Sequence, residues 1–105
     1  MNIRFNQIDD KRLGKIVAEV DGKEAGYIKY TWLPNDDLRA DGTLVYDEFR
    51  AFKLGIPLFD KLVAYATDLG VKIYPTCPFV VKMFDRKPEL RSILSESYLL
   101  TRNIP

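Results

Sequence analysis

A single cysteine is the first residue in this sequence whose type and position could do chemistry. Cys77 directly precedes Pro78 at the expected start of a helix. A thiol at a helix start can have a lowered pKa and so supply a thiolate, which is a nucleophile. A free cysteine is also commonly a small buried side chain. The residues alone leave both interpretations of Cys77 open.

A bend from Arg50 to Gly55, with the sequence Arg-Ala-Phe-Lys-Leu-Gly, is the second candidate. It comes directly before a predicted helix, where consecutive backbone N–H groups and the helix dipole hold anions such as pyrophosphate. The backbone must approach such a ligand closely, so small residues are expected at positions 51, 53 and 55. Ala51 and Gly55 meet this expectation, whereas Lys53 does not.

Lys53 gives the bend two interpretations. In the first, Lys53 takes an ordinary helical or bridge conformation, points outward and adds a cation for a phosphate. In the second, its side chain blocks the ligand. Phe52 and Leu54, on either side of it, are expected to be packing residues.

Several chemistries are excluded by what the chain lacks. Its 105 residues contain one cysteine and no histidine. An internal disulfide, a zinc site and a Cys-His or Ser-His catalytic pair are therefore excluded, and no metal is expected. The net charge of +1 gives no support for a nucleic-acid partner, which would favour a concentrated basic face.

Length and composition indicate one soluble globular domain over residues 1–105. Apolar residues make up 47% of the chain and charged residues 30%, a balance typical of such domains. The first ten residues hold no apolar core of signal-peptide length, and nowhere do 18 apolar residues run together. We therefore expect a cytoplasmic protein, not bound to membranes, that is a monomer or weak homodimer.

The first half of the chain is predicted to form antiparallel strands. Residues 15–20 alternate in polarity, the turn dipeptide Asp21-Gly22 follows, and residues 24–33 alternate again, which predicts a hairpin. Residues 34–37 are a loop by composition, residues 38–49 are a further strand, and residues 3–8 are a possible edge strand.

The second half changes from strand to helix periodicity. Apolar residues from Ile56 to Leu69 fall at steps of three and four, which predicts a helix between Gly55 and Gly70 with one buried face. Pro57 fits its first turn and Gly70 its C-terminal cap. A short strand over 71–75 then pairs parallel through a right-handed crossover. A second helix runs from 77–78 to Phe84, residues 88–94 form a short turn of helix, and the tail from Ser95 is not assigned.

This order of elements, with its local motifs, resembles the GNAT superfamily of acyl-CoA N-acyltransferases. The matching stretches are Thr-Leu-Val-Tyr-Asp-Glu-Phe-Arg-Ala-Phe-Lys-Leu-Gly from Thr43, Val-Lys-Ile-Tyr-Pro-Thr-Cys-Pro-Phe-Val from Val71, and Asp-Arg-Lys-Pro-Glu-Leu from Asp85. Together they are similar to small, single-domain GNAT-like proteins over roughly residues 13–94. The resemblance implies an α/β (α+β) fold with a mixed, mainly antiparallel sheet and helices on its faces.

The resemblance also implies a function and its site residues. Acetyl-CoA would be the co-substrate and an unidentified amine would accept the acyl group. Cys77 would be catalytic, as a nucleophile that carries the acyl group or as a group that positions it. The residues implied to bind the co-substrate are Val45, Arg50, Ala51, Phe52, Lys53, Leu54 and Gly55. The backbone N–H near Val45 would donate to the developing oxyanion.

Other catalytic groups are weaker candidates. Asp47 and Glu48 are the carboxylates of the Thr43 strand and are better interpreted as solvated charges at a strand end. Tyr46 and Tyr74 could act as acids to the leaving thiolate, although strand tyrosines mostly pack. The small relatives carry histidines at the positions of Gly42 and Lys87, and this chain has neither.

Three hypotheses for the function of this chain follow, and the sequence favours the first. The chain is an N-acetyltransferase, or a non-catalytic descendant that binds CoA or a protein partner, or an α/β protein whose order of elements matches by coincidence.

Overall fold

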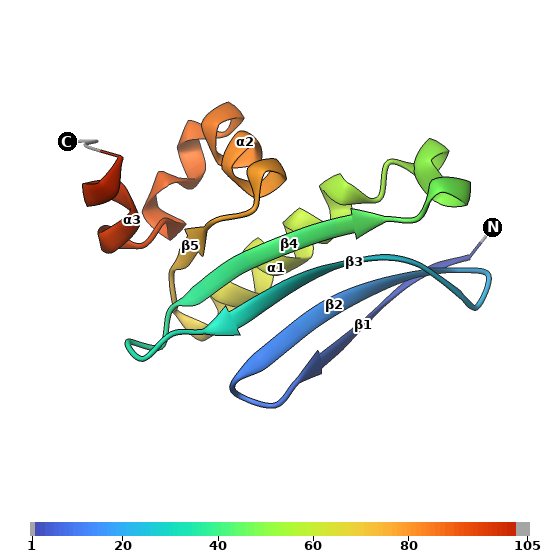
Figure 1. The fold of residues 1–105 in the computed structure, drawn as a ribbon, viewed down its shortest axis with the longest axis horizontal. Helices are drawn as coiled ribbons and strands as arrows, with labels where there is room; N and C mark the ends of the chain where they lie inside the picture. Colours follow the sequence, from blue (N-terminus) through green and yellow to red (C-terminus); the bar gives the residue numbers. More distant parts are fainter. Residues whose placement is uncertain (1, 103–105) are drawn as a thin grey trace.

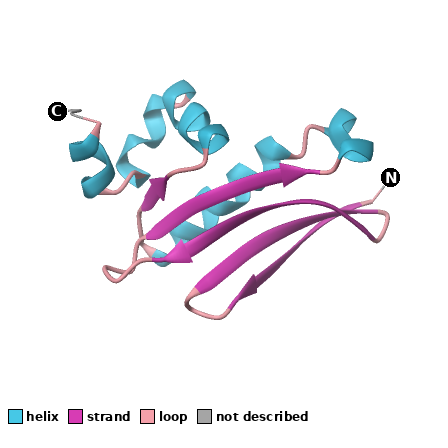
Figure 2. Cartoon of the chain, in the orientation of Figure 1, coloured by secondary structure: helices cyan, strands magenta, loops and turns pink. Residues whose placement is uncertain are grey.

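The computed structural model describes residues 2–102 and contains five strands, three α-helices and two 3-10 helices within them (Figures 1 and 2). In chain order these are β1 (Ile3–Asp9), β2 (Leu13–Val20), β3 (Lys23–Trp32), β4 (Leu38–Val45), η1 (Asp47–Phe52), α1 (Gly55–Leu69), β5 (Ile73–Pro75), α2 (Pro78–Arg86), η2 (Pro88–Ile93) and α3 (Glu96–Thr101). The mixed α/β class is as predicted.

The five strands form one sheet in the order of the sequence. β1 to β4 pair antiparallel with their chain neighbours, and β5 pairs parallel with β4. The predicted hairpin, the edge strand and the parallel pair are therefore confirmed. α1 connects β4 to β5 in the sequence, and a crossover of this kind is what a parallel strand pair requires.

α1 covers one face of the sheet, and the core lies between them. In Figure 1 the helix runs behind β3 and β4, while the near face of the first four strands carries no helix. The fully buried side chains on the sheet side include Ala18, Ile28, Tyr30, Leu38 and Ala40, and those on α1 are Leu58, Phe59, Leu62 and Ala66.

The helix itself begins and ends where Gly55 and Gly70 predicted. Gly70 caps it in the left-handed conformation, with φ of 71°. The predicted buried face was partly wrong, because Ile56 and Leu69 at the two ends are exposed and Leu58 is buried instead.

β4 ends at Val45 and not at Phe49, which corrects the predicted strand. The backbone N–H of Tyr46 donates to Ala25 at 2.9 Å, close to where β3 begins at Lys23. Beyond this point no neighbouring strand continues the ladder, so the chain turns. The Phe49 N–H donates back to Tyr46 at 2.8 Å and η1 forms.

A β-bulge at Asp41 interrupts β4. Lys29 pairs with Gly42 and Tyr30 with Ala40, which leaves Asp41 as an extra residue on β4. An extra residue shifts the alternation of the strand, so Thr43 and Val45 point to the α1 face and Gly42 and Leu44 to the open face. The bulge thus decides which side chains of β4 face the interior.

The tail, which the sequence left unassigned, forms α3. The Ser95 hydroxyl accepts a hydrogen bond from the Tyr98 N–H at 3.0 Å, which is an N-cap. The Ser95 N–H donates to Ile73 on β5 at 2.8 Å. The Tyr98 ring packs edge-on against Tyr74, with ring centroids 5.5 Å apart.

Candidate functional site

The outer half of β4 has an open edge on the side away from β3. β5 pairs with residues 38–40 of β4 only, and the ladder stops at Ala40 and Pro75. Since the Tyr46 N–H points to β3, alternation directs the Leu44 peptide to β3 and the peptides of Thr43 and Val45 to the open edge. These are donors and acceptors that an extended ligand lying between β4 and α2 would meet.

Cys77 packs directly against this edge of β4. Its Sγ is 3.5 Å from the Thr43 hydroxyl, and its N–H donates to the Ala40 carbonyl at 3.1 Å. The same carbonyl accepts from the Thr76 N–H and hydroxyl, at 3.0 and 2.9 Å. These bonds pin the start of α2 at the point where β4 and β5 separate.

The thiol is buried, in agreement with the second of the two interpretations of Cys77. Cys77 is only 5% exposed, so this structure presents it as a buried residue between Thr43 and the core.

Lys53 takes a conformation that neither sequence interpretation anticipated. It caps η1 with φ of 51° and ψ of 48°, in the left-handed region, and its side chain is exposed. The expectation of a helical or bridge conformation was therefore wrong. The backbone at position 53 adopts the form that glycine favours, and the side chain projects to solvent.

The start of α1 offers donors to an anion. The N–H groups of Gly55 and Ile56 have no acceptor within the helix, since the first turn never does, and no side chain caps them. No acidic residue lies in this first turn. The arrangement has the chemistry of a helix N-terminus that binds phosphate.

Gly55 also joins the bend to the Cys77 segment. A Cβ at Gly55 would lie 3.0 Å from Cζ of Phe79, so the absence of a side chain lets the Phe79 ring pack against the helix start. The structure thus brings together Gly55, Phe79, Cys77 and Thr43 along one line from the helix start to the β4 edge.

The charged and aromatic residues of the bend have local partners. Arg50 forms an exposed ion pair with Asp47 at 3.0 Å, and Glu48 pairs with Lys23 at 3.3 Å, so both carboxylates are solvated as expected. Leu54 is buried, and Phe52 packs against Phe49 with centroids 6.0 Å apart, as predicted.

Both candidate tyrosines have partners other than Cys77. The Tyr46 hydroxyl donates to Glu24, and this hydrogen bond, more than burial, raises the Tyr46 pKa above its ordinary value. Tyr74 packs against Tyr98.

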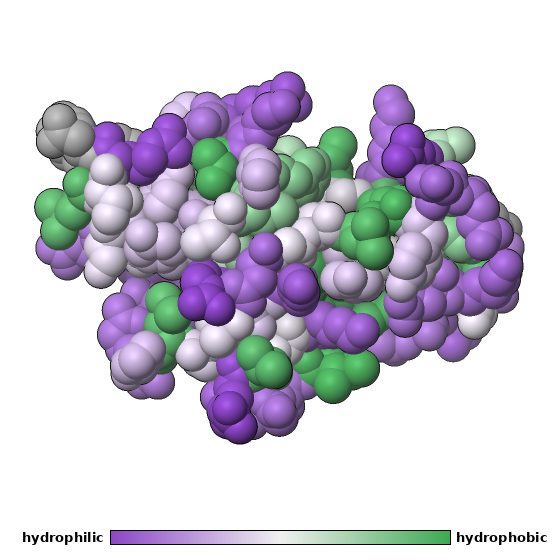
Figure 3. All heavy atoms as spheres, viewed as in Figure 1, coloured by the Kyte–Doolittle hydropathy of each residue, from purple (hydrophilic) through white to green (hydrophobic). Residues whose placement is uncertain are grey.

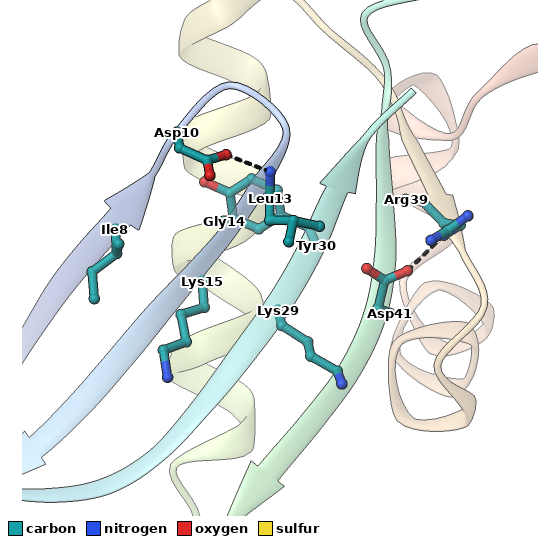
Figure 4. Close-up of a pocket in the computed structure, with 9 residues that line it drawn as sticks. All are labelled: Ile8, Asp10, Leu13, Gly14, Lys15, Lys29, Tyr30, Arg39 and Asp41. Carbon is teal, nitrogen blue, oxygen red and sulfur yellow. Dashed lines mark hydrogen bonds and ion pairs between the residues drawn. The ribbon is translucent and has the colours of Figure 1, made fainter. Parts of the chain in front are cut away.

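Asp41 is a site residue that the sequence did not reveal. Its carboxylate is half-buried on the open face, where it accepts from Arg39 Nε at 2.6 Å and from the Thr31 hydroxyl. It lines a groove of about 660 Å³ (Figure 4). The Ala40–Asp41 peptide therefore links the groove to the Cys77 side of β4. Alternation from the buried Leu38 and Ala40 places Asp41 on the same face as Arg39, and the bulge keeps Gly42 on that face as well.

Metal ligands and membrane spans are not features of the described residues. Within residues 2–102, no three side chains of the types that usually ligate metals come together. None of the helices in that range is long and apolar enough to cross a membrane.

The sequence matches one family profile over most of its length. The profile described as GCN5-related N-acetyl-transferase matches residues 15–93. This range includes the bend, Cys77, and the strands on both sides of the open edge. No curated protein matches the sequence significantly.

A solved structure has a similar fold. It is the ribosomal-protein-alanine N-acetyltransferase from Brucella melitensis biovar Abortus 2308, with a TM-score of 0.58 and 22% sequence identity. The alignment covers 82% of this chain and 64% of the Brucella chain. The present chain therefore spans less than two thirds of that protein.

Proposed function

Because the chain belongs to the family of GCN5-related N-acetyltransferases, whose common reaction is acyl transfer, we propose that it moves an acetyl group from acetyl-CoA to a primary amine. The observation that carries this proposal is the open edge of β4, which runs from the bulge at Asp41 toward the uncapped start of α1. The proposal includes that residues 1–105 form one such domain, acting in the cytoplasm as a monomer or weak homodimer.

The residues at the bend fit the phosphate end of CoA. The N–H groups of Gly55 and Ile56 would donate to the pyrophosphate, and the backbone around Lys53 already has the left-handed turn that lets the chain curve around it. Arg50 and Lys53 are exposed cations on the same turn. Their charge would add to the attraction for the phosphates.

The open edge of β4 fits the amide-containing arm and the thioester. An extended arm can pair with the peptides of Thr43 and Val45 as a strand would. One of these N–H groups would donate to the thioester carbonyl oxygen as it gains negative charge. The resemblance implies that this donor is the N–H of Val45.

The reaction then needs few groups from the protein. The amine nitrogen attacks the thioester carbon, a C–N bond forms, the C–S bond breaks, and CoA leaves as the thiolate. The amine proton passes to a base, for which we propose Asp41, and CoA thiolate is protonated from solvent. We propose that Cys77, beside Thr43, positions the acyl group without carrying it.

CoA binding is the first test. Calorimetry of the wild type with CoA is expected to give a Kd in the range of about 1 μM to 1 mM, as usual for a co-substrate. Lys53→Gly and Lys53→Ala both remove the cation, but only the first relaxes the backbone. We expect both variants to bind a few-fold more weakly. If Lys53→Gly binds CoA and wild type does not, the Lys53 side chain blocks the site, and the proposed enzyme activity is wrong.

Turnover is the second test. Wild type with acetyl-CoA and a primary amine should release free CoA thiol, and Asp41→Asn should reduce kcat by about 100-fold or more, the scale of acid–base catalysis. The intact mass with acetyl-CoA alone should stay unchanged. An added acetyl group that disappears in Cys77→Ala would show a covalent route instead. CoA binding without any turnover would favour a non-catalytic CoA-binding domain.

A further inference from the structure

We infer that the groove on the open face of the sheet binds the acid group of the acyl acceptor, so that the acceptor is a small amine carrying a carboxylate or phosphate. The inference rests on the proposed acyl transfer and names the substrate class that the same site takes. Its recognition residues are Lys29 and Lys15.

Within the part of the chain that the structure describes, neither of the two groove lysines is held by a carboxylate. Lys15 on β2 and Lys29 on β3 are directly opposite in the antiparallel register, and both side chains line the groove. Like charges directly opposite one another destabilise a sheet. Among residues 2–102, neither lysine forms an ion pair. The Lys15 ammonium lies over the Tyr27 ring, 5.0 Å from its centroid, so an anion in the groove would be bound chiefly by Lys29.

The carboxylates in the groove have partners other than the two lysines. Asp10 accepts from the N–H groups of Arg12 and Leu13, at 2.9 and 2.8 Å, and thereby shapes the turn between β1 and β2. Asp41 holds Arg39 and Thr31. The lining therefore has three basic side chains against two acidic ones, and the two cations left without a carboxylate are the lysines.

Gly42 leaves room for the Lys29 side chain to extend over β4. A Cβ at Gly42 would lie 3.2 Å from Cε of Lys29, so the lysine side chain lies across β4 where Gly42 leaves room. Figure 4 shows Lys29 extending from β3 toward β4, on the same side of the sheet as Asp41. An acid group held by Lys29 would therefore keep the rest of the acceptor next to the bulge.

The remaining walls suit a small molecule. Ile8 and Leu13 flank the groove and are 61% and 58% exposed. The space-filling view of this face shows such apolar side chains dispersed among polar ones (Figure 3). A volume of about 660 Å³ is within the range of small-ligand pockets, and the short apolar chain of an amino acid or aminoalkyl phosphate would contact these two residues.

The test compares acceptors that differ only in the acid group. β-Alanine is paired with β-alaninamide, and phosphoethanolamine with ethanolamine, which separates carboxylate from phosphate recognition. For wild type, kcat/KM should be about tenfold higher for at least one acid than for its neutral partner, equivalent to one charged contact. Lys29→Gln should bring this ratio close to one through KM, with kcat for the neutral amine nearly unchanged. Lys61→Gln, which removes a charge behind the sheet on α1, should preserve the wild-type ratio.

Three results would overturn the inference without touching the proposed function. One is turnover of neutral amines with no preference for either acid. Another is a preference that Lys29→Gln retains. A dimer in sedimentation that Leu13→Glu dissociates would also overturn it, because a second copy would then occupy the groove.

Direct binding keeps the inference testable even if acyl transfer fails. β-Alanine and phosphoethanolamine are titrated separately into the protein with CoA present, and amide NMR shifts are followed. Shifts at Lys15, Lys29 and Gly42 that vanish in Lys29→Gln are expected. No shift there from either compound means that the groove does not bind acids, whatever the outcome with CoA.

Discussion

Asp9 connects the end of β1 to the core through four donors. It accepts from the hydroxyls of Tyr30 and Tyr65 at 2.6 and 2.9 Å, from Trp32 Nε1 at 3.0 Å, and from the Lys11 N–H at 2.7 Å. Partial burial alone would raise the pKa of Asp9, but these hydrogen bonds outweigh it, so the pKa is lowered from its ordinary value of 3.8. The carboxylate therefore stabilises the fold in its charged form.

Asp9→Asn is expected to lower the free energy of unfolding by about 1–3 kcal/mol at neutral pH, because buried donors lose a charged acceptor. A lowered pKa contributes stability that is present above 3.8 and is lost as the pH falls through the folded-state value. Urea unfolding from pH 7 to 2 should therefore show the gap between wild type and variant closing at acid pH. A constant gap would mean that Asp9 does not act through its charge.

Lys53 should limit stability through its backbone. A side chain in the left-handed region costs about 1–2 kcal/mol relative to glycine, part of which glycine gives back in unfolded-state entropy. Lys53→Gly is thus expected to raise the free energy of unfolding by about 0.5–1 kcal/mol, measured by urea titration. Lys53→Ala, with the same strain and no charge, should match wild type. An equal gain in both variants would assign the effect to charge.

At the scale of elements, β4 has one satisfied side and one open side. Its peptides at Thr43 and Val45 face the gap before α2, while the Leu44 peptide faces β3. Amide exchange followed by NMR should be faster at Thr43 and Val45 than at Leu44. Acetyl-CoA should slow exchange at the first two by about tenfold or more and leave Leu44 unchanged, since a bound arm supplies partners only on the open side. Equal protection of all three would place the ligand elsewhere.

On the scale of the whole molecule, the sheet has one covered and one open face. Ile28 on β3 is fully buried beneath α1, whereas Ile8 on β1 is 61% exposed on the other face. Ile28→Ala should cost about 2–5 kcal/mol, and Ile8→Ala less than about 0.5 kcal/mol, both read from the midpoint and slope of urea unfolding. Similar costs would mean that the open face is covered in solution.

Local patterns in the sequence were sufficient for most of this architecture. Alternation over residues 15–33 predicted the hairpin, and Pro57 with Gly70 predicted the ends of α1, because each of these signals acts within a few residues. The family resemblance supplied the rest of the expected order.

Features that depend on distant pairing were not predictable in this way. β4 stops at Val45 because β3 begins at Lys23, and Gly42 lies on the same face as Asp41 because the bulge shifts the alternation. α3 has only six residues, and its cap at Ser95 is held by β5. In each case the deciding partner lies far away in the sequence.

Because Cys77 is buried, its reactivity can report local opening between β4 and α2. It is the single thiol of the chain, and we expect a thiol reagent to reach it when β4 and α2 separate. Its labelling rate at saturating reagent then equals the opening rate of the gap, with no engineered probe required. The labelling rate of Cys77 would thus measure how often β4 and α2 separate near Thr43.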